Sequence, residues 1–221
     1  DDNLTYHKER TLSLFNGIIQ KNIDIRFNAI NGISIKTLDE EVISLLKKAG
    51  MYHISLAVES GSKYIRNEVI GKNISNEKII EVFKICKKCK IETTAFFIFG
   101  MPGETKETLN DTLKLIRLIR PDLLGLFNAV PYPGTRLYEY CRQYNLLKYN
   151  LEELLNLPDL EHFSERTFIK SEVISEEYLN YFKNKIRIVG ALSFRNLADK
   201  ITIVIRKPSL IKGIAKTFIS T

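Results

Sequence analysis

Hydrophobic and polar residues alternate along this chain in two patterns, which together predict a regular series of strands and helices. Four short apolar runs predict β-strands, at residues 23–30, 52–58, 91–99 and 122–130. The third run ends in Phe96-Phe97-Ile98-Phe99, and a continuous apolar stretch of this kind suits a strand buried on both faces of a parallel sheet. Between the runs, apolar residues recur three and four positions apart, which predicts amphipathic helices.

Residues that favour helix starts and ends lie between these strands. A first helix is expected over residues 6–22. Thr37-Leu38-Asp39-Glu40 fits a capping box, in which the Thr hydroxyl and the Glu carboxylate each bind a free backbone N–H. Gly50 fits the end of the helix that follows. Further helices are expected to begin at Ser75, Thr105, Arg136 and Ser175.

The order of strands and helices predicts the fold class. Strands that begin about 30 to 40 residues apart, with helices between them, fit repeated βα units and an α/β fold with parallel strands. An open doubly wound sheet and a β/α barrel are both compatible with this pattern. In both folds, ligands bind beyond the carboxyl ends of the strands. The loops after the four strands are therefore expected to share one rim, and they cover residues 28–32, 59–62, 100–104 and 131–135.

The positive charge is concentrated at the end of the chain. The net charge is +7, but residues 183–221 contain nine Lys or Arg against one Asp, so this tail carries +8 and the rest carries −1. A nucleic-acid-binding fold is usually basic over its folded face, so no nucleic-acid partner is expected. Two interpretations of the tail remain: a helical appendage with solvated basic residues, or a helix that binds a membrane surface.

The cysteine content and the length of the apolar runs indicate in which cellular compartment the protein is expected. Three cysteines are too few for a disulfide scaffold and fit a reducing cytoplasm. No apolar run approaches the roughly 20 residues that cross a bilayer. Cys86 and Cys89 form one CxxC pair inside a predicted helix, without a second pair, which favours structural cysteines over a metal site.

The first candidate functional residue is a carboxylate at the end of the second strand. Glu59 precedes Ser60 and Gly61, and the glycine permits close backbone approach. A carboxylate here can accept two hydroxyl donors, as from a ribose, or pair with an ammonium group. The alternative is a helix-capping cluster, in which Ser60 or Ser62 starts the next helix and Glu59 pairs with Arg66.

Two glycine- and proline-containing loops follow the third and fourth strands. Gly100-Met101-Pro102-Gly103 can leave backbone groups free to bind a flat heterocycle, or it can be an ordinary turn with Glu104 favoured by the helix dipole. Pro131-Tyr132-Pro133-Gly134 is a rigid segment. Tyr132 can close over a ligand there, or the segment can be a structural turn.

Taken in chain order, these segments resemble the radical S-adenosylmethionine (radical SAM) superfamily. The resemblance is to the branch whose members often carry a cobalamin-binding domain upstream. It rests on an ordered set of segments rather than on one decisive motif. The matching segments are Asp1 to Thr5, Thr37 to Glu41, Lys48 to Gly50, Val58 to Ser62, Lys72, Phe97 to Thr105, Pro131 to Thr135 and Leu137 to Glu139.

The resemblance implies a fold and a set of cofactors. The fold is a partial β/α (TIM-like) barrel, which is incomplete here, over residues 1–150, with a helical, basic appendage over residues 151–221. The cofactors are S-adenosylmethionine and a [4Fe–4S] cluster, and cobalamin held by an upstream domain is left open. The family's CxxxCxxC loop is missing from this chain. The resemblance therefore implies a C-terminal fragment whose missing N-terminal part supplies the cluster ligands.

The implied function is that of a radical SAM enzyme that generates a 5′-deoxyadenosyl radical or transfers a methyl group. The substrate is expected to be a small or lipid-like molecule, and the chain alone is expected to be inactive. The alternative is a non-catalytic β/α binding module with a degenerate nucleotide rim. No catalytic residue and no metal ligand is identified in the chain.

Nine residues match the family's cofactor-binding positions. Asp1 and Asp2 match the end of the second barrel strand, near the cofactor amino group, and Glu59 matches the position at its ribose or methionine part. Phe97 to Gly100 matches the strand whose backbone faces adenine, and Pro131 to Thr135 matches the last loop of the rim. The full set is Asp1, Asp2, Glu59, Ser60, Phe97, Ile98, Gly100, Pro131 and Tyr132.

Overall fold

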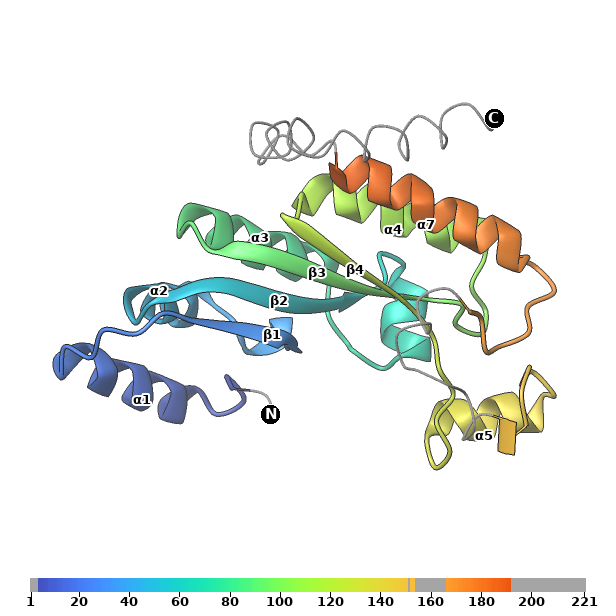
Figure 1. Ribbon diagram of the computed structural model, residues 1–221, viewed down its shortest axis with the longest axis horizontal. Coiled ribbons are helices and arrows are strands. Elements are labelled where there is room, and N and C mark those ends of the chain that lie inside the picture. The colour runs from blue at the N-terminus through green and yellow to red at the C-terminus, as the bar shows by residue number, and fades with distance from the viewer. Residues whose placement is uncertain (1–3, 151, 154–165, 192–221) are drawn as a thin grey trace.

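The computed structural model describes residues 4–150, 152–153 and 166–191, which form an α/β fold on one parallel sheet (Figure 1). Its four strands are hydrogen-bonded in chain order and all neighbouring pairs are parallel. Among the described residues the sheet is not closed, so the predicted incomplete β/α architecture is confirmed. The strands are β1 (Phe27–Ile33), β2 (Met51–Glu59), β3 (Glu92–Phe99) and β4 (Leu123–Asn128).

Helices connect the strands and cover one face of the sheet with an apolar core. Ile54 and Leu56 of β2 and Phe97 of β3 are fully buried in this core. α4 and α7 lie side by side along the sheet (Figure 1). The described helices are α1 (Lys8–Gln20), α2 (Glu40–Lys48), α3 (Asn76–Lys88), α4 (Lys106–Ile119), α5 (Arg136–Gln143) and α7 (Glu176–Ala191), with the 3-10 helix η1 (Ile35–Thr37) and the π-helix η2 (Tyr64–Val69).

The first strand differs from its predicted position. β1 covers Phe27–Ile33 instead of residues 23–30. A parallel strand forms only where a partner runs beside it, and its partner β2 begins at Met51, opposite Phe27. The preceding Ile25 instead passes the positive-φ turn at Gly50, where a Cβ atom would lie 1.8 Å from the Ile25 carbonyl oxygen. The alternation of apolar residues before Phe27 therefore does not produce a strand.

The predicted capping box at Thr37 is also wrong. The N-cap of α2 is Asp39, whose carboxylate accepts a hydrogen bond from the Val42 N–H at 2.9 Å. Thr37 belongs to η1 and donates its hydroxyl to the Ser34 carbonyl at 2.9 Å. In contrast, Ser75 and Thr105 cap α3 and α4 as predicted.

Several predictions fall on the chain ends. α7 begins after Ser175 as expected and contacts α4 and β4. Asp1, Asp2 and the tail beyond residue 191 lie outside the described residues, and the domain boundary near residue 150 stays a prediction. No helix in the described ranges has the length and apolar character that spanning a membrane requires.

Candidate functional site

A large cavity opens where the carboxyl ends of the strands meet. Its volume is about 910 Å³, within the range of roughly 300–1,000 Å³ typical of small-molecule sites. All four predicted rim segments contribute to its wall, but residues 28–32, predicted as a loop after the first strand, lie within β1 because that strand starts later than predicted. The contributions are Asn31 and Gly32 near the end of β1, Glu59 at the end of β2, Met101 after β3, and Tyr132 and Thr135 after β4. We call this space the rim cavity.

Glu59 is the buried carboxylate of the rim cavity. It is the last residue of β2, two positions after Ala57, and both residues line the cavity; a register shift against β3 lies between them. Its φ of 68° is left-handed, which costs a non-glycine residue about 1–2 kcal/mol. Its carboxylate pairs with the Lys72 ammonium at 2.8 Å. Such strain is often found at functional sites.

Arg66 fixes the loop that follows Glu59. It is fully buried and donates to the Ser60 carbonyl at 2.8 Å and to the Ile74 carbonyl at 3.0 Å. Its guanidinium also donates to the Asn76 side-chain oxygen at 2.7 Å. The alternative pairing of Glu59 with Arg66 is therefore not observed, and Arg66 ties both ends of the β2–α3 connection together.

Ser60 belongs to the support of the loop rather than to the cavity wall. Its hydroxyl lies 3.3 Å from the Thr112 hydroxyl of α4, and it accepts a hydrogen bond from the Ser62 N–H at 3.2 Å. The Gly61 N–H donates to the same Thr112 hydroxyl at 2.9 Å. These contacts attach the β2–η2 turn to the first half of α4.

The strand β3 divides its side chains between two faces. Phe96 and Ile98 line the rim cavity, and Phe97 between them is fully buried in the core with the helices. The ring of Phe96 meets the ring of Phe127 edge-to-face, with centroids 5.5 Å apart. The cavity floor is therefore aromatic and aliphatic.

A buried glutamic acid holds the loop after β3. The Gly100 N–H donates to the Glu104 carboxylate at 2.7 Å. Glu104 is only 4% exposed. Burial raises the pKa of its carboxyl to about 8, because the hydrogen bond from Gly100 offsets only part of the cost of desolvation.

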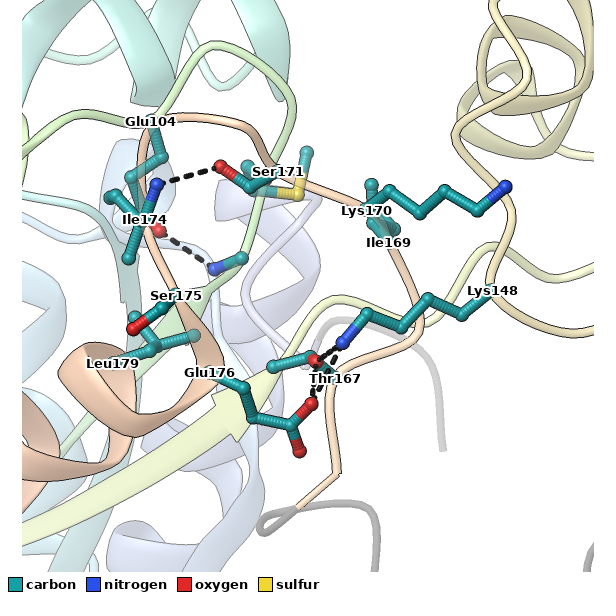
Figure 2. Close-up of a pocket in the computed structure, with 12 residues that line it drawn as sticks. Glu104, Lys148, Thr167, Ile169, Lys170, Ser171, Ile174, Ser175, Glu176 and Leu179 are labelled. Carbon is teal, nitrogen blue, oxygen red and sulfur yellow. Dashed lines mark hydrogen bonds and ion pairs between the residues drawn. The ribbon is translucent and has the colours of Figure 1, made fainter.

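Gly100 and Glu104 line a smaller cavity of about 210 Å³, outside the rim cavity (Figure 2). Figure 2 shows Glu104 on one side of it. On the other side lies the ion pair of Lys148 with Glu176, at 2.7 Å, which also binds the Thr167 hydroxyl. The loop after β3 therefore faces polar side chains in the smaller cavity, while Met101 of the same loop lines the rim cavity.

The loop after β4 combines a cap with an exposed ring. Tyr132 is 53% exposed and lines the rim cavity, whereas Pro131 is buried and does not line it. The Thr135 hydroxyl donates to the Tyr132 carbonyl at 2.6 Å and caps α5 by accepting from the Tyr138 N–H. The segment is therefore a structural turn that also presents a ring to the cavity.

Of the nine expected site residues, those that line the rim cavity are Glu59, Ile98 and Tyr132. Sequence reasoning missed the pairing of Lys72 with Glu59 and the floor formed by Phe96 and Phe127. The floor carries a sequence signal, since Phe96 is two positions from Ile98 and so shares its strand face.

The described residues do not fit the cluster that the resemblance implies. No group of three or more His, Cys, Asp or Glu residues is arranged to hold a metal ion in the described ranges. Cys86 is buried in α3, and Cys89 caps the same helix near the Ser44 hydroxyl. Burial raises the pKa of Cys141 to about 11 and keeps it a thiol.

Comparison with solved structures agrees with the fold. Coproporphyrinogen III oxidase (HemN) of Escherichia coli, a radical SAM enzyme, superposes with a TM-score of 0.58 at 17% identity, over 85% of this chain and 38% of that chain. The radical SAM methyltransferase TsrM of Kitasatospora setae superposes with a TM-score of 0.54 at 16% identity, over 80% and 39%. At these identities the likeness shows the fold alone.

Sequence comparison gives the family. An uncharacterized methyltransferase of Pyrococcus horikoshii is 31% identical over 188 residues, which are 82% of this chain and 39% of that protein. The anaerobic magnesium-protoporphyrin IX monomethyl ester cyclase of Rubrivivax gelatinosus is 25% identical over 84% of this chain and 33% of its own length. The chain thus spans about two fifths or less of these relatives. The profile of the Radical SAM superfamily matches residues 5–116, and the chain belongs to that superfamily.

Proposed function

We propose that the rim cavity binds S-adenosylmethionine, as part of a radical SAM enzyme that generates a 5′-deoxyadenosyl radical or transfers a methyl group. The observation that supports this most directly is the rim cavity itself, which gathers a charged pair and an apolar wall at the carboxyl ends of parallel strands. Membership of the superfamily implies S-adenosylmethionine and a [4Fe–4S] cluster. When bound, S-adenosylmethionine supplies the radical or the methyl group.

The groups lining the rim cavity fit the parts of S-adenosylmethionine. The Glu59 carboxylate accepts the paired hydroxyls of a ribose or an ammonium group. Lys72, which is 39% exposed, donates to the carboxylate of the methionine part while it stays close to Glu59. Ile98 and Ala129 give an apolar wall for the adenine ring. Arg66 is a positioning residue that does not touch the ligand. It binds the Ser60 carbonyl and so holds the loop next to the strained backbone of Glu59.

The cluster ligands and any cobalamin site belong to other parts of the protein in this proposal. Cobalamin enters it because TsrM has been solved with cobalamin and a [4Fe–4S] cluster bound. The substrate is a small or lipid-like molecule, and free cysteines agree with a cytoplasmic enzyme. A basic tail resting on a membrane surface is a compatible arrangement.

Equilibrium dialysis of the purified chain with radiolabelled S-adenosylmethionine tests the proposal. We expect weak, saturable binding, which Glu59→Gln weakens about tenfold because the hydrogen bonds that this side chain accepts lose the carboxylate charge. The matched control is Glu92→Gln, at the exposed opposite end of β3, which should bind like the original chain. Absence of saturable binding, or equal binding by Glu59→Gln and the control, contradicts the proposal and favours the non-catalytic module.

A further inference from the structure

A second cavity of about 310 Å³ lies beside the rim cavity and has no part in the proposed binding of S-adenosylmethionine. Its wall combines η2, the loop after β3 and the start of α5. The residues that matter here are Tyr64, Glu68, Gly103, Arg136 and Tyr140. We call it the tyrosine cavity. It shares Glu68 and Arg136 with the rim cavity, so the two spaces are neighbours.

Two short helical elements each place one tyrosine and one charged side chain in the wall of this cavity. Tyr64 and Glu68 are four positions apart on η2, and Arg136 and Tyr140 are four positions apart on α5. All four side chains line the cavity, so the two residues of each element face the same space. Each element therefore contributes one aromatic ring and one charge, and the two charges are opposite.

The tyrosine rings are accessible and supported. Tyr64 is 54% exposed and Tyr140 is 46% exposed. Gly103 makes room for Tyr64, because a Cβ atom at that position would lie 3.3 Å from its ring and from its hydroxyl. Beneath Tyr64, the buried Ile65 and Arg66 anchor η2. π-helical turns of this kind are rare and frequent at functional sites.

The two charges lack ion-pair partners in the described part of the chain. Neither Glu68 nor Arg136 appears in any of its salt bridges. On the same helix as Arg136, by contrast, Arg142 pairs with Glu139 at 2.6 Å. Arg136 thus keeps its planar guanidinium free to bind a carboxylate.

We propose that the tyrosine cavity binds a planar aromatic anion that also carries a hydrogen-bond donor. The rings of Tyr64 and Tyr140 pack against the aromatic system, Arg136 binds its carboxylate, and Glu68 accepts from the donor. The volume lies at the lower end of the range for small-molecule sites, so one fused two-ring system fits. This site does not depend on S-adenosylmethionine and is tested separately from it.

The probe is 6-amino-2-naphthoate, titrated into the full chain and followed by its own fluorescence, which no tryptophan of the protein obscures. We expect saturable binding. Tyr64→Leu and Tyr140→Leu should each weaken it about 3- to 10-fold, because an aromatic contact is lost while apolar bulk is kept. Arg136→Gln should weaken it about tenfold but change binding of the neutral 6-amino-2-naphthamide less than about twofold.

Two control variants match these changes outside the cavity. Tyr181→Leu removes a ring that is 53% exposed on α7, and Arg142→Gln removes a guanidinium from another face of α5. Both should bind the probe like the original chain. Equal affinity across cavity variants and controls, or no preference for the naphthoate over the naphthamide, overturns the proposal. Displacement of the probe by S-adenosylmethionine would place the probe in the rim cavity and would also overturn the proposal.

Discussion

At the scale of single residues, the two buried carboxylates of the rim differ in their electrostatic surroundings. Glu59 pairs with the Lys72 ammonium, so its charge is compensated where it lines the rim cavity. Within the described ranges, Glu104 accepts from one backbone N–H and forms no ion pair, and burial raises its pKa to about 8. Glu59 is therefore held by its ion pair with Lys72, whereas Glu104 at neutral pH is largely a neutral acid that holds its loop.

The raised pKa of Glu104 predicts how stability depends on pH. Between its ordinary pKa near 4.5 and about 8, the native chain binds more protons than the unfolded chain. Stability from this group is therefore present at low pH and is lost as the pH rises through that window, by about 1.4 kcal/mol per pH unit at most. Glu104→Gln should remove this slope and still accept from the Gly100 N–H.

Urea unfolding at a series of pH values measures the effect. Glu92→Gln, which neutralises an exposed glutamate of β3, is the control and should keep the pH dependence of the original chain. If Glu104→Gln keeps it as well, the protonation of Glu104 does not contribute to folding.

Single residues also mark the limit of what the sequence could predict about the site. A carboxylate at the end of a strand pointed to Glu59, because parallel strands gather their ends at one rim. Its partner Lys72 was not predictable, because it lies between η2 and α3, where no strand or helix spacing relates it to Glu59. In β3, Phe96 faces the cavity and Phe97 faces the core. The sequence did not predict which residue faces which side, because both are apolar.

At the scale of elements, the rim depends on how closely one loop approaches one helix. Gly61, after β2, lies against α4 so tightly that a Cβ atom there would be 2.4 Å from the Asp111 carbonyl oxygen and from the Thr112 Cα. Both of these atoms belong to the α4 backbone, which cannot move aside as a flexible side chain can. The absence of a side chain at Gly61 therefore allows the β2–η2 turn to pack where it does.

Gly61→Ala should destabilise the chain by about 1–3 kcal/mol, because the added methyl group forces loop and helix apart. The matched control is Gly17→Ala in α1, where a Cβ atom meets nothing within 4 Å. That change should stabilise the chain by up to about 1 kcal/mol, because alanine favours a helix over glycine. Urea unfolding separates the two, and equal effects would contradict the close approach at Gly61.

The elements themselves were mostly predictable, and each exception has an identifiable physical cause. Periodicity and capping residues predicted the βα order, and the start of α4 after Thr105 follows from a local hydrogen bond. The start of β1 was wrong because it depends on a tertiary partner, and the cap of α2 was wrong because Asp39 binds the Val42 N–H while Thr37 bonds elsewhere. β1 needs β2 beside it, and Thr37 bonds to Thr5, far away in the sequence.

At the scale of the whole molecule, the sheet has two unpaired edges among the described residues. β1 pairs only with β2, and β4 pairs only with β3. Ile30 and Phe127 are 59% and 44% exposed. Parallel sheets are normally covered on both faces, and unpaired strand edges favour aggregation. The two edges and these exposed apolar side chains are therefore the surfaces of the described sheet where aggregation is expected unless another surface covers them.

The distribution of cysteines gives the prediction for the chain as a whole. A cluster needs several thiolates around one point, and the three cysteines lie on α3 and α5, two of them buried. After anaerobic incubation with iron and sulfide, the purified chain should show no visible iron–sulfur absorption and should cleave no S-adenosylmethionine. Stoichiometric cluster formation would contradict this, and its loss in Cys86→Ser or Cys141→Ser would mean that these buried side chains leave the core.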